Sequence, residues 1–353
     1  MQIRRWHDGK ILAQQPLMDM AGYIGHRGDY HDAFLRAVRD AGIEIRMGCE
    51  VASYDENKPS ITLADGTEVV ADLIVGADGI KSKTRELVLG FHDAPKSSGY
   101  SCFRSYFPGD YLKGDERCKD FVSQDSVNIW IGPDIHLIQN TLRDGKEVNI
   151  IMTRKLSHEE DMEIKESWFQ DGDINEVLAL TTDIDPRIRA AVEKIPGPPY
   201  LLDWKICYRD PLPTWVSKSH KIALLGDSCH PHLPTSAQGA SQATESAGAL
   251  AVCLKLAGKD SIPLATRTYE KLRYPRTRLS QRNGEDLRDR WHNALKNLDE
   301  GAEIDPESVK MRNRWLYSFD AEGDAMQRWP EMSSRVSDEL RAGVITPLSD
   351  EMV

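Results

Sequence analysis

The sequence predicts an α/β protein in which a first domain with parallel strands is interrupted by a second domain built on an antiparallel sheet. Two short apolar runs, DLIVG at 72–76 and HKIALLG at 220–226, are typical of buried parallel strands. Between them, from about 99 to 155, polar and apolar residues alternate over longer stretches such as SVNIWIG and EVNIIM, which is typical of antiparallel strands. The expected segments are 1–95 (first domain, first part), 96–205 (inserted sheet domain), 206–260 (first domain, second part) and 261–353 (C-terminal helical region).

Length and composition are those of a globular protein with about two domains. The chain has 353 residues, of which 40% are hydrophobic and 29% charged. A net charge of −11 disfavours nucleic acid and anionic membranes as main partners. No apolar run approaches the roughly 18 residues that span a bilayer, and the N-terminus is not a secretory signal. Six scattered cysteines without a CxxC pattern favour reduced thiols, so a cytoplasmic protein is expected.

A helix is predicted near the N-terminus, over residues 29–41. Asp29 is the expected N-cap, and Gly42 stands just past the end. Four apolar residues fall on one stripe of this helix: Tyr30, Phe34, Leu35 and Val38.

Further elements follow from local patterns. Residues 43–54 read as a strand, and 61–70 as two short strands around Asp65-Gly66, a strong hairpin signal. A helix is expected over 239–257. Beyond 262 charged helix predominates, with a kink at Pro275. Candidate packing points there are Trp291, Trp315 and Tyr317.

Three places carry chemistry, and the first two stand at helix or strand ends. Arg27 precedes the first helix and could reach a phosphate, although an arginine extended over a helix start is the more common role when Arg27 is considered alone. Asp78, flanked by Gly76 and Gly79, ends a buried strand where nucleotides bind in open α/β folds. The alternative for Asp78 is a tight strand-to-helix turn in which the carboxylate is a cap.

The third place is the stretch LLGDSCHPHLPTSAQGASQATES at 224–246. Asp227 follows a strand and could accept hydrogen bonds from sugar or polyol hydroxyls, and two prolines stiffen the turn after it. Gly239 and Ala240 open a helix whose free N–H groups would stabilise an anion. A metal site is the alternative reading of this stretch. It would need at least one further ligand from elsewhere in the chain, and no residue spacing in the sequence indicates one, so no metal is expected. Its candidate ligands are Cys229, His230 and His232.

Together these motifs resemble those of FAD-dependent aromatic monooxygenases, the family of salicylate hydroxylase and p-hydroxybenzoate hydroxylase, and most of all its fungal branch. The strings GADGIKSKTR, LLGDSCHPHLP and AQGASQATES match the family's motifs in order. HRGDYHDAFLRA, WIGPDIHLI and YLLDWKICYRDPLPTW also fall where the family has similar strings, so the resemblance covers most of residues 1–290. It implies a Rossmann-like FAD-binding domain interrupted by a substrate-binding sheet, and a role in secondary metabolism.

The resemblance also implies roles for individual residues. Arg27 would contact the FAD phosphate or ribityl region, and Asp78 with Gly79 would lie near the pyrophosphate and the path of the nicotinamide. Gly226 and Asp227 would bind the ribityl hydroxyls. The remaining candidates are Pro231 and Pro234, which would line the isoalloxazine, and Gly239 and Ala240, which would present N–H groups near flavin N1. The implied reaction uses NADH or NADPH to reduce FAD and O2 to hydroxylate a small phenolic molecule.

The chain also departs from the family pattern. Glu245-Ser246 stands where Glu-Asp is usual, and Asn140-Thr141 where a Tyr-Pro often stands. The family's GxGxxG unit is missing, because no two glycines in the chain are separated by a single residue; Gly22, Gly25 and Gly28 follow no buried strand. We therefore expect an N-terminally incomplete FAD-binding domain, with an apolar strand and GxGxxG encoded upstream of Met1.

Two functions remain open at this stage. The first is a working FAD hydroxylase present in truncated form, which the three surviving motifs favour. The second is a flavin-free scaffold put to another use, such as an isomerase, a cyclase or a partner-binding protein. The sequence identifies no catalytic base; His136 and Tyr208 are candidates by residue type only. It leaves the oligomeric state open.

Overall fold

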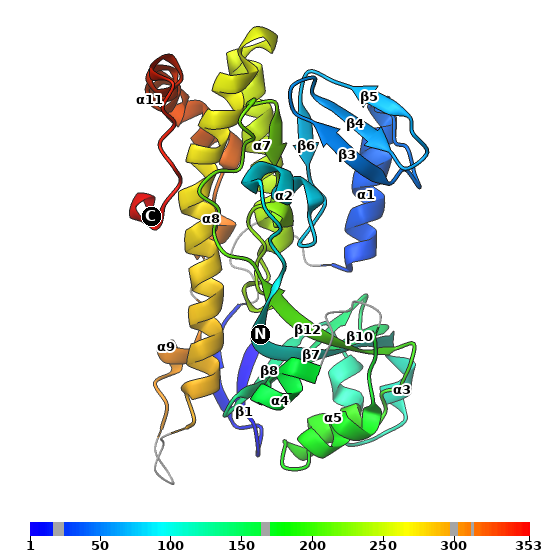
Figure 1. The fold of residues 1–353 in the computed structure, drawn as a ribbon. Coiled ribbons are helices and arrows are strands. Elements are labelled where there is room, and N and C mark those ends of the chain that lie inside the picture. Colours follow the sequence, from blue (N-terminus) through cyan, green and yellow to red (C-terminus); the bar gives the residue numbers. More distant parts are fainter. Residues whose placement is uncertain (17–24, 164–169, 297–302, 312–313) are drawn as a thin grey trace. The chain divides into compact units, whose positions relative to one another are not determined.

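The computed structural model describes residues 1–16, 25–163, 170–296, 303–311 and 314–353 (Figure 1). The chain forms two compact units. Unit 1 comprises residues 1–42, 97–207 and 286–317, and unit 2 comprises residues 43–96, 208–285 and 318–353. The four segments expected from the sequence are defined differently from these two units, and that division remains a prediction.

Unit 1 is built on an eight-stranded sheet in the order β11-β12-β7-β10-β9-β8-β1-β2. Strands β7 to β10 pair antiparallel, which confirms the sheet expected over 99–155, whereas β1 lies parallel to β8. The strands are β1 (Gln2–Arg5), β2 (Ile11–Gln14), β7 (Lys96–Pro108), β8 (Val127–Gly132), β9 (Ile135–Leu142), β10 (Glu147–Lys155), β11 (Gln170–Asp171) and β12 (Leu201–Tyr208).

One tight turn fixes the register of the β9–β10 hairpin. Arg143, Asp144 and Gly145 all have positive φ, between 57° and 72°. A Cβ at Gly145 would come within 2.0 Å of the Val122 carbonyl oxygen, so only glycine fits this position.

Both faces of the large sheet bury apolar side chains within unit 1. Phe103 and Trp130 belong to a core with Val177 and Ile188, and Ile129 and Ile131 to a second core with Leu287 and Trp291. The helices of this unit are α1 (Arg27–Asp40), α3 (Asp110–Lys113), η1 (Lys119–Val122), α4 (His158–Glu163), α5 (Ile174–Leu180), α6 (Pro186–Val192), α9 (Pro306–Val309) and α10 (Arg314–Tyr317).

Helix α1 corrects two expectations. Its N-cap is His26, whose Nδ1 accepts from the Gly28 N–H, whereas Asp29 lies inside the helix and pairs with Arg143 at 2.8 Å. The apolar stripe is not buried: α1 has no buried residue, and Phe34 is 59% exposed. Gly42, with φ of 71°, follows the helix as expected.

Unit 2 contains a hairpin sheet and a separate parallel pair. Strands β3 (Val51–Asp55), β4 (Ser60–Leu63) and β5 (Glu68–Val70) pair antiparallel, and the Asp65-Gly66 turn joins β4 to β5 as predicted. The strand expected over 43–54 is wrong before Val51. Residues 43–50 form no strand: their backbone contact to a neighbouring strand segment is the Ala64 N–H donating to the Glu50 carbonyl, and Ile43 and Met47 stay 60% and 80% exposed.

The parallel pair joins β6 (Ile74–Gly76) to β13 (Ile222–Leu224). The predicted parallel strands are thus confirmed, but full burial is confirmed only for β13. Val75 of β6 is 40% exposed, and among the described strands β6 pairs only with β13.

Long helices supply most of the core of unit 2 (Figure 1). The helix predicted over 239–257 is confirmed, and the next helix continues through Pro275 rather than ending there. The helices are α2 (Lys83–Leu89), η2 (Gly226–Ser228), η3 (Pro234–Ser236), α7 (Gly239–Ala257), η4 (Lys259–Ser261), α8 (Ile262–Asn293, in unit 2 as far as Glu285), α11 (Ala321–Ala342) and η5 (Asp350–Met352).

One of the three predicted C-terminal packing points, Trp291, is confirmed, and the other two stay predictions. Trp291 is 1% exposed and packs in unit 1, whereas Trp315 and Tyr317 remain 39% and 38% exposed. In the part of the chain that the structure describes, no helix has both the length and the apolar character needed to cross a bilayer.

Candidate functional site

The turn after β6 is organised by Asp78. Its Oδ1 accepts from the Ser82 hydroxyl at 2.6 Å, and its Oδ2 accepts from the Thr84 N–H at 3.0 Å and the Thr84 hydroxyl at 3.1 Å. Ser82 is the N-cap of α2. These contacts correspond to the turn-and-cap alternative for Asp78, and they hold its carboxylate at the carboxyl end of the parallel pair.

The two glycines that flank Asp78 are required for different structural reasons. A Cβ at Gly76 would lie 2.4 Å from the Thr84 side chain, so glycine lets α2 approach the strand. Gly79 has φ of +78°, and a Cβ there would meet no atom within 4 Å. The backbone at Gly79 therefore faces open space.

The turn after β13 lies beside the turn after β6. The Leu225 N–H and the Ser228 hydroxyl both donate to the Gly76 carbonyl, at 2.9 and 2.7 Å. Gly226 has φ of +68°, and Asp227 lies in the single turn η2. The structure thus brings the two acidic turns together, as expected for the carboxyl ends of adjacent parallel strands.

Arg85 locks these two turns, a role that sequence reasoning missed. Its guanidinium is 1% exposed and donates to the Ser228 carbonyl at 3.3 Å, the Asp210 carbonyl at 2.7 Å and the Asp93 carboxylate at 2.6 Å. Burial lowers the pKa of Arg85 and the ion pair with Asp93 opposes that shift. Two of its partners, Ser228 and Asp210, lie more than 120 residues away in the sequence, so no local pattern could indicate them.

The histidines after Asp227 are structural. His230 Nε2 lies 3.0 Å from the Ser246 hydroxyl, and His232 Nδ1 lies 2.7 Å from the His230 carbonyl. Burial lowers the pKa of His230 well below its usual value and that of His232 to about 4. Burial also raises the pKa of the Cys229 thiol. Among the described residues, no group of three or more His, Cys, Asp or Glu is arranged to hold a metal ion.

Ser246 also meets a buried cation. Its hydroxyl accepts from Arg273 Nε at 3.2 Å, while Arg273 pairs with Glu245 at 2.9 Å. The departure at Glu245-Ser246 therefore places one carboxylate, rather than two, beside this arginine.

The start of α7 presents donors. Helix α7 begins at Gly239, and no side chain caps its first turn. Gln238, at the N-cap, is 1% exposed, and its Nε2 has no hydrogen-bond partner. A 19-residue helix has a positive dipole end, so an acceptor or an anion is favoured at Gly239 and Ala240. Pro231 and Pro234 lie on the loop that leads to this helix.

Two arginines of unit 1, Arg27 and Arg104, form a positively charged pair. Arg27 is the first residue of α1, and Arg104 lies half-buried on β7. Burial, and then the neighbouring Arg27, lower the pKa of Arg104. No carboxylate of the described residues pairs with either guanidinium. The sequence carried one signal of Arg104: a charge within the alternating strand SCFRSYF.

The two candidate bases differ in their surroundings. His136 is 1% exposed, and its Nδ1 lies 2.7 Å from His292 Nε2. Burial lowers its pKa well below the usual value, so His136 is a neutral structural ring. Tyr208 is 38% exposed and lines a pocket of unit 2.

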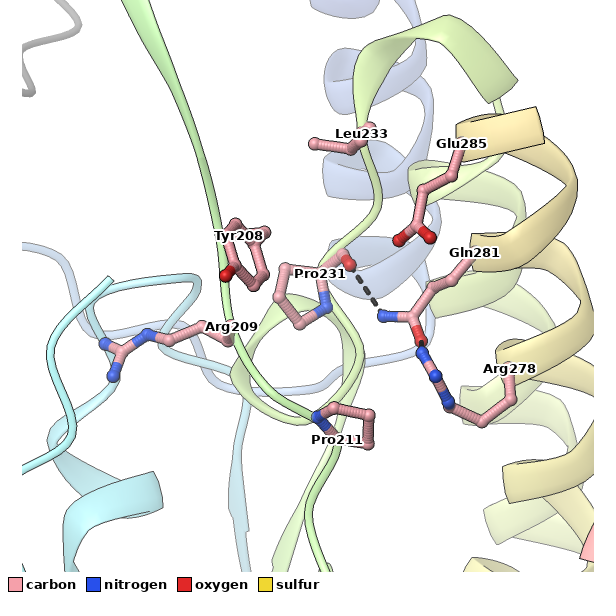
Figure 2. Close-up of a pocket in the computed structure, with 8 residues that line it drawn as sticks. All are labelled: Tyr208, Arg209, Pro211, Pro231, Leu233, Arg278, Gln281 and Glu285. Atoms are coloured by element: carbon pink, nitrogen blue, oxygen red, sulfur yellow. Dashed lines mark hydrogen bonds between the residues drawn. The ribbon is translucent and has the colours of Figure 1, made fainter. Parts of the chain in front are cut away.

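This pocket has a volume of about 180 Å³ (Figure 2). Figure 2 shows Tyr208, Pro231 and Leu233 along one side and Gln281 and Glu285 of α8 along the other. Gln281 donates to the Pro231 carbonyl at 2.7 Å and so ties α8 to the proline-containing loop.

Comparison with known proteins agrees with these features. Residues 29–280 match a family described as FAD binding domain. Asperlicin C monooxygenase of Petromyces alliaceus is 30% identical over 342 residues, which are 93% of this chain and 72% of that protein. FAD-dependent monooxygenase nodY2 of Hypoxylon pulicicidum is 33% identical over 285 residues, which are 78% of this chain but only 60% of that protein.

Solved structures show the same fold. The complex of CtdE with FAD and substrate 4 has a TM-score of 0.84 and 29% identity, and the match covers 95% of this chain and 82% of that one. A salicylate hydroxylase substrate complex has a TM-score of 0.76 at 23% identity, covering 94% and 81%. The motif resemblance is confirmed: the chain belongs to the FAD-dependent aromatic monooxygenase family.

Proposed function

We propose that the chain hydroxylates a small aromatic or phenol-like molecule, using FAD, O2 and NADH or NADPH, in the secondary metabolism of a fungus. The observation that carries the proposal is the adjacency of the two acidic turns and the uncapped start of α7, all within unit 2. We place this activity in the cytoplasm, which six free cysteines support.

The donors and spaces of unit 2 fit the flavin end of FAD. The buried Nε2 of Gln238 needs an acceptor, and the first N–H groups of α7 can supply donors to a flavin carbonyl. Gly79 leaves open space beside the backbone for a ligand. The Asp227 carboxylate is the residue type that accepts from ribityl hydroxyls.

The pyrophosphate end fits less well. A dinucleotide pyrophosphate is usually held by a Gly-rich turn at a helix N-terminus, and the sequence contains no GxG. Of the residues proposed here, only Arg27 carries a charge suited to phosphate. Asp78 and Gly79 are proposed to lie near the pyrophosphate, but they offer it no positive charge. The family's cofactor is therefore supported at one end and weakly provided for at the other.

When bound, FAD supplies the redox chemistry, which is transfer of electrons from the nicotinamide and activation of O2. The chain's own residues bind and polarise. The N–H groups of Gly239 and Ala240, at the positive end of α7, stabilise negative charge beside them. Pro231 and Pro234 present a rigid apolar edge that excludes water.

Arg104 is the proposed substrate contact. A half-buried guanidinium without a carboxylate partner among the described residues is costly unless an anion reaches it. A phenolate or carboxylate of the substrate would meet that need with a charge-assisted hydrogen bond. A second cation, Arg27, strengthens the local field.

The test is oxygenation with FAD supplied at saturating concentration, because we expect the chain alone to retain the cofactor poorly and to be inactive without added FAD. The chain is mixed with NADPH, isotopically labelled O2 and a panel of phenols and indoles, and products are analysed by mass spectrometry. We expect one labelled oxygen atom in the product of at least one aromatic compound. Arg104→Gln is expected to raise the substrate Kd about tenfold or more while FAD binding is unchanged. Arg143→Gln, at an exposed arginine of the same unit, is the matched control.

The second candidate is a scaffold without flavin, such as an isomerase, a cyclase or a partner-binding protein. The same experiment separates the two: conversion of a substrate without FAD or O2 would establish the second function and reject the first.

A further inference from the structure

The pocket of unit 2 adjoins a line of donors on α8. Tyr274, Arg278 and Arg282 are spaced by four residues and so share one face of that helix. Arg278 lines the pocket, where its Nη1 donates to Gln281 at 2.7 Å. Figure 2 shows the Arg278 guanidinium next to the Gln281 amide at the pocket wall.

These donors all bind one carboxylate, that of Asp350. Arg278 contacts both of its oxygens, at 2.9 and 3.1 Å, Arg282 donates to Oδ2 at 2.7 Å, and the Tyr274 hydroxyl donates to Oδ1 at 3.1 Å. The hydrogen bond from Arg278 helps most to hold the pKa of Asp350 below its usual range. An anion that presents two or more oxygens is therefore what this face of α8 recognises.

The Asp350 carboxylate can leave without detaching the C-terminal segment. Asp350 is 44% exposed and Arg282 45%, so the ion pair between them contributes little. Arg278 is only 14% exposed, and its two-point pair with Asp350 is the contact that a competing anion must replace. The preceding residues are anchored separately. The Leu348 N–H donates to the Pro213 carbonyl at 2.7 Å, and Lys271, which is fully buried, donates to the Thr346 carbonyl at 3.0 Å.

We propose that the reduced nicotinamide dinucleotide docks here, with its nicotinamide ring in the pocket and one phosphate on Arg278 and Arg282 in place of the Asp350 carboxylate. The inference rests on the proposed function, in which NADH or NADPH is the electron donor. Asp350 is then an internal competitor that occupies the phosphate position while the donor is absent.

The pocket suits one small ring with a polar edge. Its 180 Å³ is below the roughly 300–1,000 Å³ of sites for drug-sized ligands, so it admits a ring but not a whole dinucleotide. The Tyr208 ring and Pro231 offer flat apolar contacts, and Gln281 and Glu285 offer amide and carboxylate groups to a carboxamide. Pro231 is also a proposed isoalloxazine contact, so a ring bound here would lie close to the group that it reduces.

Equilibrium binding tests the proposal independently of turnover. Reduced nicotinamide mononucleotide and NADPH are titrated into the full chain while nicotinamide fluorescence is followed. We expect Arg278→Gln and Arg282→Gln to weaken binding about tenfold each, and Asp350→Asn to tighten it severalfold because the competing charge is lost. Asp338→Asn and Arg341→Gln, which remove an exposed ion pair of α11, are the matched controls, and thermal unfolding checks that every variant folds.

Each outcome decides the matter. Equal affinities in wild type, Arg278→Gln and Asp350→Asn would overturn the site, and so would no detectable binding of either nicotinamide. Inorganic phosphate that competes as strongly as the mononucleotide would show that the ring does not use the pocket. Variant-dependent nicotinamide binding without oxygenation of any substrate would uphold the site and reject the proposed function. Oxygenation of a substrate together with nicotinamide binding that is the same in all variants would support the proposed function and reject this site.

Discussion

The eight-stranded sheet of unit 1 and the parallel pair β6–β13 of unit 2 bury their side chains to different degrees. In the large sheet Trp130, Ile131 and Leu137 have no exposed surface, and apolar cores lie on both faces. In the parallel pair Val75 is 40% exposed, and polar bonds from Ser228 and Arg85 join the turns. Unit 1 is thus held by apolar packing, whereas the acidic turns of unit 2 are positioned by a few specific hydrogen bonds.

The largest expected effect concerns FAD. We expect the 353-residue chain to bind FAD about two to six decades more weakly than a family member that carries GxGxxG. The reason is that two or three phosphate hydrogen bonds to charged groups are worth roughly 3–9 kcal/mol. Titration followed by flavin fluorescence measures the Kd. Tight stoichiometric binding would show that the turns and the start of α7 suffice.

A pair of truncations compares the two sheets directly. Leu137→Ala should lower the free energy of unfolding by about 2–5 kcal/mol, because it opens a cavity in a closed core. Val75→Ala should cost less than about 1 kcal/mol, because that side chain is already in contact with water. Urea unfolding followed by tryptophan fluorescence gives both values. Equal losses would contradict the contrast between the sheets.

Asp227→Ala tests the role proposed for the acidic turns of unit 2. Losing a charge-assisted acceptor should weaken FAD binding by about 1.5–3 kcal/mol, which is roughly ten- to a hundredfold. Arg27→Ala should act similarly. Asp338→Ala on α11, an exposed aspartate, is the control and should leave the Kd unchanged. An unchanged Kd in Asp227→Ala would remove that residue from the site.

The smallest effect is a pH dependence of the stability of unit 1. Burial lowers the pKa of His292 to about 4 and that of its partner His136 well below the usual value. Both rings therefore bind protons more weakly in the folded chain than in the unfolded chain. Their contribution is complete above about pH 6.5 and is lost as the pH falls toward 4.

Urea unfolding at pH 7.5 and at pH 5 measures this loss. Replacing the ring in His292→Leu should reduce the difference between the two pH values, with the remainder due to other buried rings such as His230 and His232, whereas His31→Gln, at a surface position, should leave the difference unchanged. A full pH dependence in His292→Leu would assign the effect to other groups.

Most elements were predictable because their signals are local. The Asp65-Gly66 hairpin, the α7 boundaries and the parallel strands follow from turn chemistry and apolar runs within a few residues. The two acidic turns, at Asp78 and Asp227, were predictable from the sequence for the same reason. Their partners were not: nothing near Arg85 in the sequence indicates Ser228, and nothing near Asp350 indicates Arg278.

Two errors had a common cause. The stretch before Val51 has a strand pattern, and Phe34 lies on a helical apolar stripe, but a pattern shows only which residues are ready to be buried. Whether they are buried depends on a partner element, because strand hydrogen bonds and apolar contacts both need a neighbour. Asp29 failed as an N-cap for a simpler reason, since His26 offers Nδ1 one turn earlier.

The pairing of Ile74 with Ile222 has a consequence for biosynthesis. About 150 residues separate these partners, so at a synthesis rate of roughly 5–20 residues per second β6 waits about 7–30 s for β13 to emerge. The hairpins β8–β9 and β9–β10 join neighbouring strands and can close in microseconds once made. During the interval the nascent chain carries a finished hairpin sheet and an unpaired strand edge, which is the period when a chaperone would be needed most.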